Sequence, residues 1–452
     1  MQMSEQMREQ IKDRIITVEQ ALDLIHDGDQ IVTGLGSSEA QLLMDNLHHL
    51  KERGVKDVVV NNCLPMKAYE FIVNPEYRYT VNVAGWFYNP AIRKAHKNGN
   101  MSFIPNNLHF AGEKRFDHIK VAVFANLASM PDEHGYVSLS LGNTYEKEAL
   151  AAAKRDGGIV ILEINPNAPR CFGDVQVHIS EVDYFIEADY PIPVIPDADP
   201  NDKDRQIASY ILPHIKDGSC IQLGIGGIPN AVATSLYGKK NLGVHTEMLT
   251  SEMAKLAKAG VINGKCKNQD NGMITTTFAM GTQELYDFID NNPAVKFQAG
   301  SVTNNPFVIA KNDNQISINT TLEVDVTGQC CSESLGSMQF SGSGGQSDTV
   351  IGAQLSKGGK SFIALYSTAM VKNPATGERE EVSKIVCQLK PGATVSTSRN
   401  DLDYLVTEYG CVHLKGTTIA ERVEKIISIA HPKFREALWE EAYRLGIVAK
   451  KD

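Results

Sequence analysis

Two twelve-residue segments, Ile25–Gly36 and Ile215–Gly226, are identical at six positions. Each contains an Asp-Gly pair, a short apolar run and a Gly-x-Gly turn, in the same order. The Asp-Gly pair is typical of a chain that leaves a helix, and the apolar run is typical of a buried strand that ends in a tight turn. A further strand is expected about twenty residues later in both copies, at 58–61 and 242–245. The repeat therefore predicts two related open α/β domains.

A proline-rich segment marks the expected domain boundary. Tyr190–Pro200 contains four prolines in eleven residues, which excludes a helix or a central strand. A chain of 452 residues is also too long for a single hydrophobic core. We therefore expect an N-terminal α/β domain over residues 1–195 and a C-terminal α/β domain over 196–452.

Composition narrows the classes of protein that this chain can belong to. The apolar fraction of 42% and the charged fraction of 22% are those of a globular protein. A net charge of −10 argues against partners such as nucleic acid or an anionic membrane. The eight cysteines include no Cys-x-x-Cys pair, which indicates a reduced, cytoplasmic compartment and no zinc site. No secretion signal and no membrane span are expected, because no long apolar run is present.

The second copy of the repeat contains the strongest candidate site. The turn Gly224-Ile225-Gly226 would present backbone N–H groups to an anion or an oxyanion. The next expected strand ends in Thr246-Glu247, and strand ends in an open α/β sheet face one crevice. An ordinary βα turn and a surface or capping glutamate are the structural alternatives. His245 would share a face with Glu247 if the strand continues regularly, although a packing role is favoured for it.

Two further glycine-rich stretches follow. Gly344 and Gly345 lie in a run of small residues, and Lys357-Gly-Gly-Lys360 precedes an expected strand. The Gly-Lys-Ser at 359–361 is not a P-loop, because position 354 is Gln and a strand, not a helix, is expected to follow. None of the glycine turns completes a dinucleotide-binding fingerprint.

Six motifs taken together resemble one family. They are Gly-Ile-Gly-Gly-Ile-Pro-Asn-Ala-Val (224–232), His-Thr-Glu-Met (245–248), Phe-Ala-Met-Gly-Thr (278–282), Ile-Asn-Thr-Thr-Leu-Glu-Val-Asp (318–325), Ser-Gly-Gly-Gln-Ser-Asp (343–348) and Thr-Glu-Tyr-Gly (407–410). In this order they resemble the acetyl-CoA hydrolase/transferase family of class I CoA-transferases. The similarity is greatest to the 4-hydroxybutyrate and butyryl-CoA:acetate CoA-transferases, and it implies a homodimer or a dimer of dimers.

The resemblance implies a role for each matched residue. Glu247 would be the nucleophile, and Glu408 a supporting carboxylate near it. The oxyanion- and CoA-binding groups would be Gly224, Ile225, Gly226, Gly344, Gly345 and Lys360. No metal and no permanently bound cofactor is implied, and coenzyme A esters are the expected substrates. The stretch Tyr409–Gly416 departs from the family pattern, which bears on substrate identity more than on reaction class.

These residues suit CoA transfer through a glutamyl-CoA thioester. A carboxylate that attacks a thioester conserves its energy as an anhydride and then as a new thioester, and each step builds an oxyanion. An acyl-CoA hydrolase on the same fold is the first alternative. A non-catalytic ligand-binding protein is the second, and a dinucleotide-dependent oxidoreductase is a third.

Overall fold

The computed structural model describes residues 3–373 and 376–450, and the chain forms two compact units. The first comprises the chain up to Pro196 together with 245–254 and 273–305. The second comprises 197–244, 255–272 and the chain from Pro306 onwards. The first unit ends its N-terminal stretch at Pro196, next to the predicted boundary at 195. Two segments of the predicted C-terminal domain, 245–254 and 273–305, belong to this first unit.

The first unit is built on a seven-stranded sheet with the order β10-β7-β5-β1-β2-β3-β4, in which all strands run parallel. The strands are β1 (Gln30–Thr33), β2 (Val58–Asn62), β3 (Val81–Gly85), β4 (Met101–Phe103), β5 (Val123–Ala128), β7 (Ile159–Ile164) and β10 (Tyr184–Glu187). β6 (Tyr136–Ser138) and β9 (Gln176–His178) form a separate hairpin.

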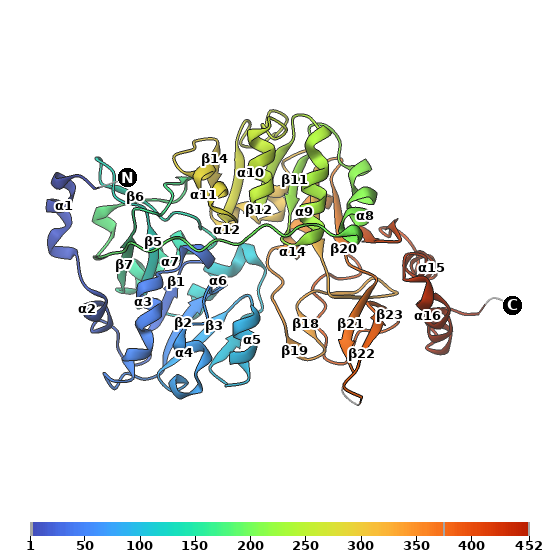
Figure 1. Ribbon diagram of the computed structural model, residues 1–452, viewed down its shortest axis with the longest axis horizontal. Coiled ribbons are helices and arrows are strands. Elements are labelled where there is room, and N and C mark those ends of the chain that lie inside the picture. The colour runs from blue at the N-terminus through green and yellow to red at the C-terminus, as the bar shows by residue number, and fades with distance from the viewer. Residues whose placement is uncertain (1–2, 374–375, 451–452) are drawn as a thin grey trace. The chain divides into compact units, whose positions relative to one another are not determined.

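Helices cover this sheet (Figure 1). They are α1 (Glu5–Ile11), α2 (Val18–Leu22), α3 (Gln41–Asn46), α4 (Glu70–Val73), α5 (Pro90–His96), α6 (Ala111–His118) and α7 (Glu146–Asp156). Helices α2 to α5 share one apolar core with the sheet, and α7 packs against β5 and β7. Two short helices from later in the chain, α11 (Gln283–Ile289) and α12 (Gly300–Thr303), belong to the same unit.

The second sheet has nine strands in the order β25-β24-β20-β15-β11-β12-β13-β14-β8. Its strands are β8 (Phe172–Gly173), β11 (Cys220–Leu223), β12 (Gly243–Leu249), β13 (Ile274–Ala279), β14 (Val295–Phe297), β15 (Gln315–Thr320), β20 (Lys360–Ala364), β24 (Tyr404–Thr407) and β25 (Gly410–His413). β11, β12, β15, β20 and β24 run parallel, and β25 returns antiparallel to β24.

The strand orders of the two sheets confirm the predicted duplication. β1 lies between β5 and β2, and β11 lies between β15 and β12. Both strands end directly before a Gly-x-Gly turn, and both pair in parallel with the strand that follows in the chain. Seven consecutive strands of each sheet match in this way, so the open α/β fold inferred from the repeat is correct.

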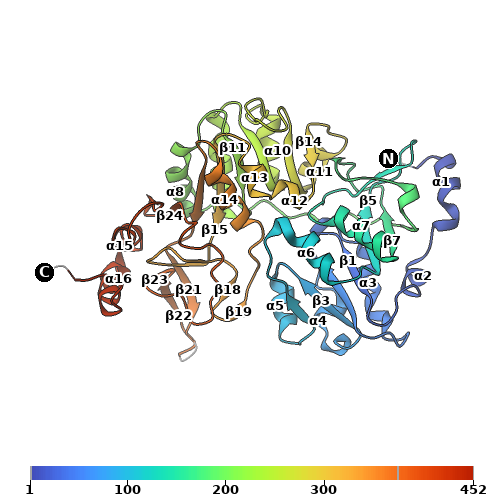
Figure 2. The ribbon, with the colours of Figure 1, turned by 180° about the vertical axis from the view of Figure 1, so that it is seen from behind.

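Helices of the second unit pack on its part of this sheet. They are α8 (Asp202–Ile211), α9 (Gly227–Thr234), α13 (Pro306–Ile309), α14 (Gln346–Leu355), α15 (Ile419–Ser428) and α16 (Pro432–Arg444). α8 and α9 lie side by side (Figure 1). α14 lies against β15 and β20, and Figure 2 shows α14 beside β15. α10 (Ser251–Lys258) begins in the first unit and ends in the second.

Short strands complete the second unit. They are β16 (Glu323–Asp325), β17 (Cys330–Cys331), β18 (Ser334–Leu335), β19 (Met338–Gln339), β21 (Thr368–Lys372), β22 (Arg379–Ser383) and β23 (Ile385–Val386). β21 and β22 pair antiparallel. Within residues 3–373 and 376–450, no helix combines the length and the apolar character that a bilayer crossing needs.

Candidate active site

Glu247 lies in β12 of the first unit, two residues before the strand ends. Its carboxylate Oε2 accepts a hydrogen bond from the side-chain amide of Asn304 over 2.9 Å. Its backbone carbonyl accepts a hydrogen bond from the Thr276 hydroxyl on β13 over 3.1 Å. Asn304 is 1% exposed, so the donor is fixed inside the protein while Glu247 itself is partly exposed. A partly exposed carboxylate that a buried donor orients is suited to act as a nucleophile.

β12 runs without a break through His245 and Glu247, so the two side chains share one face of the strand. His245 is buried, and its Nε2 lies 2.8 Å from the backbone carbonyl of Thr303. This contact anchors the end of α12, which is followed directly by Asn304. His245 therefore holds the segment that orients the glutamate.

A buried thiol is also close to Glu247. Cys63 follows β2, and its backbone N–H donates to the Tyr145 hydroxyl over 3.1 Å. Burial raises the pKa of Cys63 well above its usual range, and the charges of Glu247 and Glu146 raise it further. Cys63 therefore stays a neutral thiol at neutral pH and does not compete as a nucleophile.

The turn after β11 belongs to the second unit. Gly226 adopts φ +113° and ψ −177°, a conformation open to glycine alone. The amide of Gly224 donates to the carbonyl of Ile318 over 3.1 Å and is therefore occupied. The amides of Ile225 and Gly226 have no hydrogen-bond acceptor among the described residues. Of the oxyanion donors predicted in this turn, the amides of Ile225 and Gly226 are therefore the two that are available.

The same turn is held in place by α8. A Cβ atom on Gly227 would lie 2.4 Å from Oδ2 of Asp204, so only glycine fits there. Asp204 is buried, and its Oδ1 accepts a hydrogen bond from the Tyr366 hydroxyl over 2.6 Å. The turn therefore rests on a rigid polar support.

The second glycine loop lies at the same edge of the sheet. Gly344 adopts φ +51°, and Gly345 directly precedes α14. The Gln346 side chain donates to the carbonyl of Thr320 over 3.2 Å, which fixes the start of α14 at the carboxyl end of β15. The amides of Gly344 and Gly345 have no acceptor within the described parts of the chain. This loop is a second set of available N–H donors.

Glu408 follows β24, at the carboxyl edge of the second unit's sheet. Its carboxylate accepts hydrogen bonds from the amide and the hydroxyl of Ser367, each over 2.8 Å, and pairs with Lys203 over 3.3 Å. Burial alone would raise the pKa of Glu408, but the Ser367 hydrogen bonds and the Lys203 charge lower it overall. Glu408 is therefore an ionised, fully engaged carboxylate.

Lys360 lies at the opposite edge. Lys360 is the first residue of β20 and pairs with Ile316 of β15. β11 runs parallel to these strands, and the glycine turn follows its carboxyl end. Its ammonium is 3.3 Å from Nδ1 of His214 and 5.9 Å from the ring centroid of Tyr404. The structure does not bring Lys360 to the glycine turns, so this position gives no support to its predicted contact with CoA.

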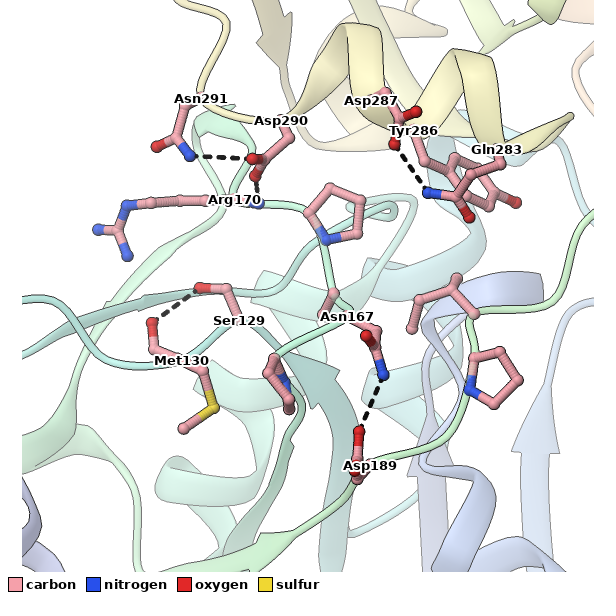
Figure 3. Close-up of a pocket in the computed structure, with 15 residues that line it drawn as sticks. Ser129, Met130, Asn167, Arg170, Asp189, Gln283, Tyr286, Asp287, Asp290 and Asn291 are labelled. Atoms are coloured by element: carbon pink, nitrogen blue, oxygen red, sulfur yellow. Dashed lines mark hydrogen bonds between the residues drawn. The ribbon is translucent and has the colours of Figure 1, made fainter. Parts of the chain in front are cut away.

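A pocket of about 550 Å³ in the first unit is separate from all of these residues (Figure 3). It lies beyond the ends of β5, β7 and β10, and α11 closes it from the other side. Asp189, Asp287 and Asp290 make its lining acidic, and Arg170 is the charged group of opposite sign. This pocket contains none of the predicted site residues.

Sequence reasoning did not find Asn304 or Cys63. Asn304 stands in Asn-Asn-Pro, which is typical of a turn, and nothing in the sequence connects it with Glu247. The strand expected at 58–61 corresponds to β2, but the strand order is needed to place Cys63, which follows it.

Comparison with known proteins identifies the family of this chain. Residues 1–196 match the model of the acetyl-CoA hydrolase/transferase N-terminal domain, and 281–442 match that of the C-terminal domain. A succinyl-CoA:cyclohexane-1-carboxylate CoA transferase from Geobacter metallireducens is 44% identical over 81% of both chains. A 4-hydroxybutyrate coenzyme A transferase from Clostridium kluyveri is 40% identical over 95% of this chain and 97% of its own.

The solved structure of RipA from Yersinia pestis is similar over 98% of this chain and 100% of its own chain. Its TM-score is 0.90 at 34% sequence identity. The fold and the two relatives define an enzyme of the CoA-transferase class. The chain belongs to the acetyl-CoA hydrolase/transferase family, as the six motifs predicted.

Proposed function

We propose that the protein moves CoA between a short-chain acyl-CoA and a free carboxylate such as acetate. Butyryl-, 4-hydroxybutyryl-, propionyl- and acetyl-CoA are the proposed donors. The single observation that carries the proposal is the Glu247 carboxylate, partly exposed and held through Oε2 by Asn304. This hydrogen bond orients the carboxylate for attack on the thioester.

The reaction proceeds in two matched halves. The Glu247 carboxylate attacks the thioester carbonyl, the C–S bond breaks, and an acyl-glutamyl anhydride and CoA thiolate form. The thiolate then attacks the glutamyl carbonyl, which releases the first carboxylate and leaves a glutamyl-CoA thioester. A second carboxylate reverses these steps and departs as the new acyl-CoA. No proton is consumed, so no separate general acid is required.

Backbone amides stabilise the oxyanions that form at each attack. The amides of Ile225, Gly226, Gly344 and Gly345 are the proposed donors. Removal of one such donor typically costs about 100- to 1000-fold in rate. Glu408 is proposed as a supporting carboxylate in the second unit. The proposed reaction uses no metal ion.

The proposal is tested by trapping the covalent intermediate. Enzyme incubated with acyl-CoA and no acceptor should carry CoA on the peptide that contains Glu247, and borohydride should inactivate it only after this exposure. Glu247→Gln should abolish transfer, because an amide is a poor nucleophile. Glu247→Asp should lose about 100-fold, because a displacement near 1 Å costs that much. An adduct on Glu408 or Glu252 would show that another carboxylate is the nucleophile.

Omitting the acceptor also separates transfer from hydrolysis. A transferase releases no more than one equivalent of free acid under these conditions, whereas a hydrolase continues to turn over. A screen of carboxylate acceptors, with new acyl-CoA masses as the readout, identifies the second substrate.

Assembly and compartment are further parts of the proposal. We expect a cytoplasmic homodimer or a dimer of dimers, as the family resemblance implies. Native mass spectrometry distinguishes these two assemblies from a monomer.

A further inference from the structure

A charged cluster lies at the carboxyl edge of the second unit's sheet. Lys203 stands in the first turn of α8, Tyr366 follows β20, Glu408 follows β24, and Lys384 joins β22 to β23. The two ammonium groups lie 5.8 Å and 6.0 Å from the ring centroid of Tyr366. None of the six motifs that indicate the family contains Lys203, Lys384 or Tyr366.

The two lysines differ in their partners. Lys203 pairs with Glu408 over 3.3 Å, and Ser367 supplies two further hydrogen bonds to the same carboxylate. Lys384, by contrast, has no acceptor within hydrogen-bond distance of its Nζ among residues 3–373 and 376–450. The charge of Lys203 is therefore engaged, whereas the N–H groups of Lys384 are available.

The ammonium of Lys384 needs an acceptor. Burial lowers the pKa of Lys384 to about 8, although the charges of Glu408 and Glu323 oppose this shift. At pH 7 the group is therefore still mainly protonated and has three N–H donors. The side chain is only partly buried, and a ligand that displaces its remaining water must offer an oxygen in exchange.

The charge balance indicates what kind of oxygen this is. The positive charges of Lys203 and Lys384 are offset by Glu408 and by Asp204, which accepts the Tyr366 hydroxyl. A phosphate would add two negative charges to a cluster that has no positive excess. An uncharged carbonyl oxygen is the acceptor that fits.

The cluster is linked to the glycine turn through two side chains. Tyr366 contacts Lys384 on one side and Asp204 on the other, and Asp204 in turn supports Gly227. A thioester held at this turn would extend its pantetheine arm away from the reacting carbon. Two amide groups lie on that arm between the sulfur and the phosphates.

Building on the proposed function, we propose that the ε-ammonium of Lys384 donates a hydrogen bond to an amide carbonyl of the pantetheine arm of the acyl-CoA. Lys203 keeps Glu408 ionised and leaves Lys384 for the ligand. Tyr366 forms the side of this subsite.

Thioesters of different length test the inference. The same acyl group is presented on CoA, on pantetheine, which lacks the phosphates, and on ethanethiol, which lacks the amides as well. Lys384→Met should lower kcat/KM about 10- to 100-fold on the first two, by the same factor, because a hydrogen bond from a charged donor is typically worth that much. On the ethanethiol ester it should match the wild type within about twofold.

Two patterns would overturn the inference. A loss confined to the CoA ester would mean that Lys384 binds a phosphate, and an equal loss on all three esters would mean that it acts at the reacting carbon through Glu408. Lys390→Met is the matched control, because Lys390 lies 3.9 Å from Glu323 and its side chain is 61% exposed. This control should behave as the wild type on every ester.

Direct binding separates the inference from the proposed reaction. In a Glu247→Gln background, calorimetry with acyl-CoA should give a Kd about 10-fold or more higher once Lys384→Met is added. An unchanged Kd overturns the subsite, whatever the transfer activity of the wild type. If the Kd rises with Lys384→Met but the wild-type enzyme transfers no CoA, the proposed reaction is overturned and the subsite is not. Lys384→Gln provides the same comparison if the methionine variant does not fold.

Discussion

The Asn304 side-chain amide lies 2.9 Å from Oε2 of Glu247 and donates a hydrogen bond to it. Asn304 is almost fully buried, and its own Oδ1 has no partner within the described chain. Asn304, at the end of α12, thus contributes a neutral donor to the orientation of the proposed nucleophile. Because this donor is uncharged, it orients the carboxylate without itself adding a counter-charge that would weaken its nucleophilicity.

Asn304→Ala should therefore lower kcat while the protein stays folded. Loss of one orienting hydrogen bond typically costs about 10- to 100-fold when it positions an attacking atom. Asn304→Asp should be worse, because a second carboxylate beside Glu247 favours the protonated, unreactive form. Initial rates at saturating acyl-CoA and acetate measure this effect.

Asn167→Ala is the matched control for Asn304. Its side-chain amide also donates to a carboxylate, that of Asp189, but at the separate pocket of the first unit. Normal turnover in Asn304→Ala would mean that Asn304 does not orient the attacking carboxylate.

Gly226→Ala should disable the turn after β11. At φ +113° an alanine is strained by about 1–3 kcal/mol, and the backbone relaxes away from the conformation that presents the Ile225 and Gly226 amides. We expect kcat to fall about 100-fold or more, the typical effect of losing one oxyanion donor. Turnover is compared with thermal unfolding of the same variant.

Gly238→Ala is the control for this substitution, because nothing lies within 4 Å of the added Cβ and its φ is not in the left-handed region. It should retain normal turnover. Full activity in Gly226→Ala would remove this turn from the reaction.

Lys360→Ala decides whether the lysine implied by the family motif binds CoA. Its ammonium contacts His214 and Tyr404 at the amino end of β20, away from the glycine turns. We expect acyl-CoA affinity to change less than twofold. Burial and the Lys360 charge both lower the pKa of His214, so the pKa of His214 should rise in the variant, as followed by NMR. A fivefold or greater loss of affinity would restore Lys360 to the binding site.

The sequence predicted the repeat and the sheet edge because these depend on local patterns, since glycine turns after apolar runs identify strand ends. The strand expected to end at His245 continues to Leu249, so Glu247 lies inside β12. Asn304, Lys203 and Lys384 depend instead on which strands are neighbours, and no local pattern encodes that. Lys360 is the opposite case. The family motif implied that it binds CoA, but the strand direction places it at the amino edge of the sheet, whereas the glycine turns lie at the carboxyl edge.

The last prediction concerns Glu39, a buried carboxylate three residues after the first Gly-x-Gly turn. Burial raises the pKa of Glu39 from 4.5 to about 8, although hydrogen bonds from the Met66 amide, the Tyr69 hydroxyl and the Asn62 side chain oppose the shift. Between pH 4.5 and 8 the folded protein keeps a proton that the unfolded chain releases. The free energy of unfolding contributed by this group is therefore fully present below pH 4.5 and is lost as the pH rises to about 8.

Glu39→Gln isolates this effect from that of Glu163, whose pKa burial also raises, to about 7. Glutamine does not titrate, so the variant should gain stability relative to the wild type as the pH rises, by up to about 1.4 kcal/mol per pH unit. Urea unfolding at pH 5, 6, 7 and 8 measures the difference. Glu5→Gln, on the exposed face of α1, should run parallel to the wild type. Parallel curves for Glu39→Gln as well would mean that its three donors hold Glu39 ionised, since donors to a carboxylate favour the charged form.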